Sequence, residues 1–182
     1  MKIIPNKSTD DYEPAAVLEQ IRARRGAAGL LNLDRMLLHS PPLAEGWNLF
    51  VGKVRREFQL PDKLRELAIC TVAILNGAEY EMHHHAPLWV KSGATAQQVA
   101  ALRRLEHEQD QEPLSDFDAA EKAVIRLTKE MTRQVRVTEA TLRAARASLP
   151  NDRQLVELIA VVATYNMVSR FLVATGVEIE PT

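Results

Sequence analysis

The sequence predicts an all-α protein, a multi-helix bundle of about seven to nine helices. Apolar residues recur at spacings of three and four along most of the chain, which is typical of amphipathic helices. The 7 Gly and 9 Pro fall mostly between the apolar stretches, where they separate helices rather than interrupt them. No alternating strand of useful length and no internal repeat is visible.

Three helices are predicted in the N-terminal third: residues 15–25, 30–39 and 43–58. The first ends near Gly26 and Gly29, and Pro41-Pro42 separates the second from the third. On the third helix, apolar side chains at helical spacing predict one buried face: Trp47, Phe50, Val51 and Val54.

The fourth predicted helix, residues 61–75, is apolar on nearly every side. Pro61 suits its first position. A helix with so little polar surface is expected to be buried on most sides. Asn76-Gly77 ends it, and a fifth helix follows over residues 79–91.

Capping residues predict the helices of the C-terminal half. In order, they are Thr95 with Gln98 for a short helix toward Leu105, Asp116 or Asp118 for 119–132, Thr138 for 139–148, and Asn151 with Gln154 for a last helix that Gly176 ends. Residues 107–113 are polar and are predicted to form a loop.

Charge and cysteine content exclude several classes of function. Lys and Arg total 23 against 24 Asp and Glu, for a net charge of -1, so we expect neither nucleic acid nor an anionic membrane as a partner. The only cysteine, Cys70, makes no intramolecular disulfide, no dithiol redox centre and no zinc–thiolate site.

Neither a targeting signal nor a membrane span is expected. Residues 1–26 hold acidic residues and lack the apolar stretch of a signal peptide. The most apolar region, residues 155–177, contains Glu157, Asn166 and Arg170, which are unfavourable in a span that faces lipid. The sequence therefore predicts a cytoplasmic protein.

The densest titratable cluster lies at residues 79–85. Consecutive helical side chains point in different directions, so His83, His84 and His85 do not converge on one ion. Glu81 and His85 share a helix face, but a metal site there needs a third ligand from elsewhere, and we expect none.

Glu66 is a carboxylate on the nearly uniformly apolar helix predicted over residues 61–75. Burial raises the pKa of a carboxyl and suits it to acid–base chemistry. The alternative is a structural role, in which Glu66 faces solvent, or pairs with a neighbour of Arg65 or with Lys63. Pro87 likewise has two interpretations, a kink beside a pocket or a bend around the core.

Together these residues resemble the carboxymuconolactone decarboxylase and alkylhydroperoxidase-D-like family. The family pattern is a glutamate, eleven residues, Cys-x-x-Cys, three residues and a histidine. Glu66 holds the glutamate position and His85 the histidine position, whereas Ala78 and Glu81 replace the two cysteines. The resemblance covers residues 30–177, with His39-Ser40-Pro41 before the motif and Tyr165-Asn166-Met167 after it.

The resemblance implies one domain over residues 1–182, in which residues 1–29 form an N-terminal extension. It also implies an alkylhydroperoxidase-D-like helical fold and a homo-oligomer, a trimer or hexamer or else a dimer. The peroxidase branch reduces hydroperoxides with a dithiol that this sequence lacks. Cys70 lies on the wrong helix to replace it and is expected to pack in the core.

The favoured function is a cofactor-independent acid–base enzyme, a decarboxylase or isomerase acting on a small lactone or carboxylic acid. Its predicted catalytic residues are Glu66, Glu81 and His85, with His85 as general acid or base, Glu81 as its partner and Glu66 as the buried carboxylate. The predicted substrate-binding residues are Tyr80, His84 and Tyr165. Arg170 is expected to form a helix-face salt bridge rather than to bind a substrate carboxylate.

Two alternatives remain open at this point. One is a hydroperoxide-reducing antioxidant protein, which the missing cysteines disfavour. The other is a non-catalytic oligomeric scaffold, in which Glu66 and His85 form a structural pair.

Overall fold

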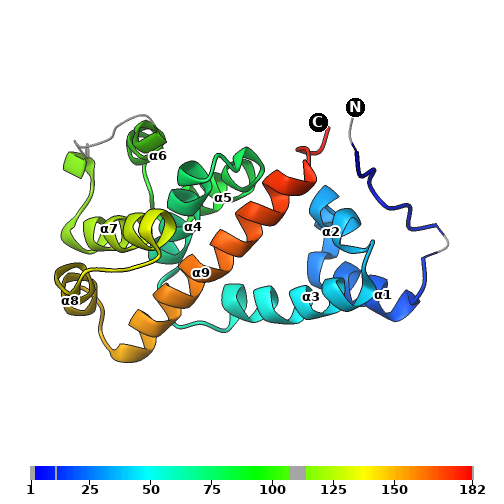
Figure 1. Ribbon diagram of the computed structural model, residues 1–182, viewed down its shortest axis with the longest axis horizontal. Helices are drawn as coiled ribbons and strands as arrows, with labels where there is room; N and C mark the ends of the chain where they lie inside the picture. The colour runs from blue at the N-terminus through cyan, green and yellow to red at the C-terminus, as the bar shows by residue number, and fades with distance from the viewer. Residues whose placement is uncertain (1–2, 11, 107–113, 182) are drawn as a thin grey trace. The chain divides into compact units, whose positions relative to one another are not determined.

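A computed structural model describes residues 3–10, 12–106 and 114–181. Within these ranges the chain forms nine α-helices, three short 3-10 turns and no strand (Figure 1), which confirms the predicted all-α class. The α-helices are α1 (Ala15–Arg25), α2 (Asn32–Leu37), α3 (Pro41–Arg56), α4 (Asp62–Leu75), α5 (Glu79–Lys91), α6 (Ala96–Arg103), α7 (Ala119–Gln134), α8 (Glu139–Ala147) and α9 (Asp152–Thr175).

Two boundaries near the N-terminus differ from those predicted. The helix expected over residues 30–39 is limited to α2, and α3 begins at Pro41 rather than after the two prolines. Proline is tolerated in the first turn because the N–H it lacks has no partner inside the helix there. The loop predicted at residues 107–113 lies outside the described residues.

The chain divides into two compact units. The terminal unit consists of Met1–Glu57 with Leu172–Thr182, and the central unit is Phe58–Phe171. In the terminal unit α3 packs against α1 and α2. Trp47, Val51 and Val54 are buried as predicted, but Phe50 is 49% exposed.

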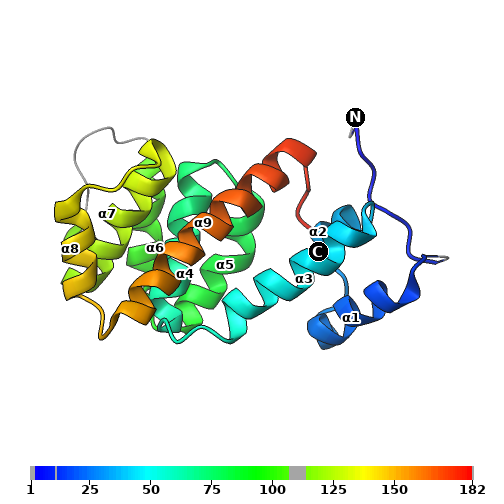
Figure 2. The same ribbon diagram turned by 60° about the horizontal axis from the view of Figure 1, so that its bottom comes forward.

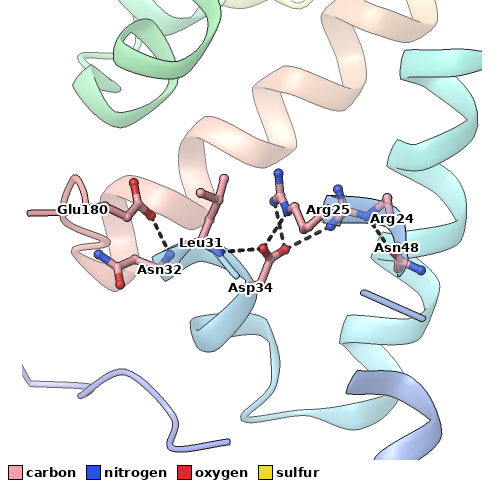
Figure 3. Close-up of polar contacts among 7 residues, drawn as sticks. All are labelled: Arg24, Arg25, Leu31, Asn32, Asp34, Asn48 and Glu180. Carbon is pink, nitrogen blue, oxygen red and sulfur yellow. Dashed lines mark hydrogen bonds and ion pairs between the residues drawn. The ribbon is translucent and has the colours of Figure 1, made fainter. Parts of the chain in front are cut away.

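The terminal unit contains a buried cluster of charges around Asp34 (Figure 3). Arg25 holds this carboxylate with both Nε (2.7 Å) and Nη2 (2.9 Å), and Arg24 adds a third contact at 3.0 Å. Burial lowers the pKa of Arg24, and the neighbouring positive charge of Arg25 adds to the shift. The cluster ties α1 to α2, with Asn48 of α3 also bonded to Arg24.

The C-terminal segment is anchored to the same unit. The Asn32 backbone N–H, in the first turn of α2, donates to the Glu180 carboxylate at 2.6 Å (Figure 3). The Asn32 side chain donates to the Glu178 carbonyl at 2.9 Å. A negative charge is favourable at this end of a helix.

The central unit is organised around α4, which packs against α5, α6 and α7 (Figure 2). Every residue from Arg65 to Ile74 is buried, as the apolar sequence of this helix predicts. α7 also packs against α8.

The predicted caps of α6 and α7 are confirmed, and they are joined to each other. Thr95 and Gln98 bond reciprocally (3.0 and 3.1 Å), as do Asp118 and Glu121 (2.9 and 2.8 Å). Gln98 Nε2 then donates to Glu121 Oε2 at 2.9 Å, and Lys63 Nζ lies 2.8 Å from Glu121 Oε1. The buried Glu121 therefore connects the N-terminal ends of α4, α6 and α7.

The last helix, α9, is long and apolar enough in composition to cross a membrane, with a mean hydropathy of 1.5 over its most apolar 18 residues. A core helix passes the same test, and 44% of that window is buried in the protein. Its polar residues bond within the central unit. Glu157 accepts the backbone N–H groups of Gln59 and Leu60, and Asn166 donates to Thr132.

Candidate functional site

The two helices that carry the candidate residues are joined by a short turn in the central unit. Gly77, between α4 and α5, has a φ of 63°, a left-handed conformation that glycine adopts without strain. The Ala78 N–H reaches back to the Ala73 carbonyl at 2.8 Å. The Asn76 side chain donates to the Asn166 side chain at 3.2 Å, so this turn is also fixed to α9.

Glu66 of α4 and His85 of α5 form a buried pair. His85 Nδ1 lies 2.6 Å from Glu66 Oε2, and the two residues are 7% and 3% exposed. The ring of Tyr165, from α9, packs edge-on against the His85 ring with centroids 5.1 Å apart. Three of the residues predicted from sequence are therefore brought together from three different helices.

Glu81 lies one turn before His85 on α5 and is 2% exposed. Neither of its carboxyl oxygens has a hydrogen-bond partner among the described residues. Burial raises the pKa of Glu81 to about 8, and the Ser169 hydroxyl, which donates to the Tyr165 carbonyl, only partly opposes this shift. The carboxyl is thus mostly protonated at neutral pH.

Glu66 is the hydrogen-bond partner of His85 Nδ1, whereas the sequence favoured Glu81 as the partner of His85. The alternative in which Glu66 pairs with Lys63 is wrong, because Lys63 binds Glu121. Glu66 is also too buried to face solvent.

Cys70 is fully buried, one turn after Glu66 on α4. Burial raises the pKa of its thiol, and the negative charges of Glu66 and Glu81 add to the shift. The thiol remains protonated and is a poor nucleophile. Both carboxyl groups lie within electrostatic range of this one side chain, which places them in one region of the central unit.

The remaining candidates, Tyr80 and His84, contact each other on α5. Their rings are 4.5 Å apart and tilted by 54°. His83 is exposed, and its ring lies 5.1 Å from that of His84 at an angle of 90°. Among the described residues, no group of three or more His, Cys, Asp or Glu side chains is arranged to hold a metal ion.

Two contributors were missed by the sequence interpretation. Arg65 is 8% exposed, and its Nε lies 3.4 Å from Glu66 Oε1. Ser169 is fully buried next to Glu81. Arg65 had a detectable signal, since a basic residue inside a nearly uniform apolar helix needs a partner. Ser169 had no such signal in the sequence.

Arg170, for which a helix-face salt bridge was expected, donates to the Asn166 carbonyl at 2.8 Å.

A polar pocket of about 360 Å³ lies elsewhere in the central unit, among Lys63, Gln98, Asp116 and Glu121. It includes none of the candidate residues. Its buried groups already bind one another through the capping network of α6 and α7, so the pocket is a structural junction.

Comparison with known proteins agrees with the resemblance. The sequence model of the Carboxymuconolactone decarboxylase family matches residues 41–130. No curated protein matches the sequence significantly.

Two solved structures share the fold. One is an uncharacterized peroxidase-related protein from Silicibacter sp. TM1040, with a TM-score of 0.80 and 16% identity over 98% of this chain and 92% of that one. The other is a cysteine-to-alanine variant of the debrominase Bmp8 in complex with 2,3,4-tribromopyrrole, with a TM-score of 0.74 and 14% identity over 99% of this chain and 93% of that one. At these identities the likeness concerns the fold.

Proposed function

We propose, from the match of residues 41–130 to the carboxymuconolactone decarboxylase family, that this chain is a cofactor-independent acid–base enzyme. The proposed reaction is the decarboxylation or isomerisation of a small lactone or carboxylic acid. Glu66, Glu81 and His85 would carry the chemistry.

The observation that carries the proposal is Glu81, a buried carboxyl one turn from a buried Glu–His pair. Within the described parts of the chain, neither of its oxygens has a hydrogen-bond partner of good geometry, and the Ser169 hydroxyl lies beside it. A protein gains no stability from such a group, and groups of this kind cluster at functional sites. A pKa of about 8 makes Glu81 a proton donor near neutral pH, where general acids work best.

The proposed division of labour follows from the hydrogen bonds. Glu66, as a carboxylate, accepts from Nδ1 of His85, which leaves the imidazole lone pair on Nε2, the basic atom. His85 then removes a proton from the substrate in an isomerisation. Glu81 delivers a proton to the carbanion or enolate that forms when a proton or carbon dioxide leaves. Tyr80, His84 and Tyr165 are proposed to contact the substrate.

Peroxide reduction by the dithiol of the peroxidase branch is disfavoured, because Ala78 and Glu81 occupy the positions of that pair. The protonated, fully buried Cys70 does not substitute for it. The peroxidase-related relative and the debrominase therefore support the fold of this chain and not its chemistry.

The test is a ligand screen followed by a turnover assay. Wild type, His85→Asn and His83→Asn are heated with a panel of small lactones and dicarboxylic acids, and any compound that raises Tm is assayed for loss of carbon dioxide or isomerisation. His83 is the matched control because it is exposed on the same helix. We expect a compound that stabilises wild type and His83→Asn, is turned over by both, and has no effect on His85→Asn.

A flat response to every compound would contradict the proposal and favour the scaffold alternative. In that case Glu66→Gln and His85→Asn should change only stability or assembly. Retained turnover in Cys70→Ser is also expected, since the thiol has no role in the proposed reaction.

A further inference from the structure

We propose that Arg65 is the positioning residue of the Glu66–His85 pair, because its guanidinium keeps Glu66 a carboxylate and thereby holds the proton of His85 on Nδ1. The inference deepens the proposed function and rests on it for its catalytic consequence. The contacts that carry it involve only side chains of this chain.

The two oxygens of the Glu66 carboxyl contact different partners. Arg65 Nε lies 3.4 Å from Oε1, and His85 Nδ1 lies 2.6 Å from Oε2. Arg65, Glu66 and His85 are all less than 9% exposed. A buried carboxylate far from positive charge tends to take up a proton, and an adjacent guanidinium opposes that uptake.

The Arg65 guanidinium also contacts a second carboxylate. Its Nη1 lies 3.0 Å from Oδ1 of Asp62, one turn earlier on α4, whose side chain is 72% exposed. The guanidinium therefore spans from a carboxylate in solvent to one in the core. A planar guanidinium that contacts two carboxylates through different nitrogens is fixed in orientation, which suits a positioning role.

The charge state of Glu66 decides which imidazole nitrogen is basic. A carboxylate only accepts hydrogen bonds, so Nδ1 must donate and Nε2 keeps the lone pair. A protonated Glu66 can instead donate to Nδ1, and the imidazole proton then moves to Nε2. In that tautomer Nε2 no longer accepts a proton from a substrate.

Two further titratable groups near the pair are mostly uncharged at neutral pH. Glu81, on the next turn of α5, is mostly protonated at neutral pH. The Cys70 thiol is protonated as well. Tyr165 contributes a ring contact to His85. Arg103, whose positive charge lowers the pKa of Cys70, pairs with Glu79 on the exposed side of α5.

The experiment is NMR of protein labelled with ¹⁵N-histidine at neutral pH, with the His85 signals assigned by their loss in His85→Asn. In wild type we expect a downfield proton resonance from Nδ1–H and a nitrogen shift typical of an unprotonated Nε2. In Arg65→Gln we expect loss of that proton resonance and an exchange of the two nitrogen shifts. Arg153→Gln, which removes an Nε–carboxylate contact of 2.8 Å to Glu157 on α9, is the matched control and should leave the His85 signals in place.

Unchanged His85 signals in a folded Arg65→Gln would overturn the inference, and so would the same loss in Arg153→Gln. If Arg65→Gln does not fold, Arg65→Met is measured instead, because its apolar side chain suits the buried position; the same two outcomes decide. This readout requires no substrate. A protein without turnover but with the expected signals would refute the proposed function and leave the positioning role intact.

Discussion

Burial of the Glu81 carboxyl destabilises its charged form. Its carboxyl is 2% exposed and lacks a hydrogen-bond partner among the described residues. Its pKa rises from 4.5 to about 8, so the folded protein binds a proton there that the unfolded chain releases above pH 4.5. Ionisation of Glu81 therefore does not lower the free energy of unfolding below pH 4.5. Between pH 4.5 and 8 that free energy decreases as pH rises.

This linkage predicts the behaviour of Glu81→Gln. The neutral amide has similar size and does not titrate, so the variant should lack the part of the pH dependence that comes from Glu81. That part has a slope of about 1.4 kcal/mol per pH unit between the two pKa values. Urea unfolding of wild type and Glu81→Gln at pH 5, 6.5 and 8 measures it.

We expect Glu81→Gln to gain stability over wild type as pH rises, with little difference at pH 5. Parallel pH profiles for the two proteins would show that Glu81 is not held protonated by burial. Glu79→Gln is the control, because Glu79 lies exposed at the start of the same helix and should not alter the profile.

At the same scale, the sequence left two interpretations of Glu66 open, and only contacts across helices separate them. Position on an apolar helix suggested burial, but the partners come from residue 65 on the same helix and from residue 85 on the next. Spacing along one helix favoured Glu81 as the partner of His85. The turn at Gly77 instead directs α5 back along α4, which brings Glu66 to Nδ1.

At the scale of elements, the central unit depends on the junction of α4, α6 and α7. Glu121 accepts from the Asp118 N–H and from Gln98, and it pairs with Lys63. Each of these groups belongs to the first turn or cap of a helix, where backbone N–H groups lack partners inside the helix. One buried carboxylate thus serves three helix ends.

Glu121→Ala is expected to destabilise the protein by about 3 kcal/mol, because removing one partner of a buried ion pair leaves the others unsatisfied. Equilibrium unfolding in urea measures the loss.

The control for this change is Glu139→Ala. Glu139 occupies the first turn of α8 and pairs with Arg143, but both side chains are more than three-quarters exposed. A loss below about 1 kcal/mol is expected there. Equal losses in the two variants would mean that the junction contributes no more than an ordinary helix end.

Helix boundaries followed the capping residues closely where the cap is a side chain. Thr95, Asp118, Thr138 and Asn151 all accept from backbone N–H groups as their positions predicted. The boundaries near Pro41 were less accurate, since two prolines fit either between helices or in a first turn. Local chemistry does not distinguish these two cases.

At the scale of the whole molecule, apolar side chains remain exposed on α9. Val156 is 63% exposed and Met167 is 44% exposed, although both belong to the most apolar helix of the chain. The two residues are eleven positions apart, which places them on the same side of the helix. We propose that a second copy of this chain covers that side, in line with the oligomer that the family resemblance implies.

The matching prediction concerns assembly. Light scattering coupled to size-exclusion chromatography should give a multiple of the chain mass for wild type and a smaller species for Met167→Glu. Val135→Glu is the control, because Val135 is 84% exposed in the turn after α7. A monomeric wild type would refute the oligomer, and dissociation by both variants would show that the effect is not specific to α9.

The sequence by itself determined the all-α class, the order of the helices, most of their ends and the resemblance to one family. These properties depend on local periodicity, on capping side chains and on a motif that spans one turn. The tertiary structure alone decided which carboxyl binds His85, which one stays protonated, and that Arg65 and Tyr165 join them. Those answers depend on burial and on contacts between helices distant in sequence, and both arise only when α4, α5 and α9 pack together.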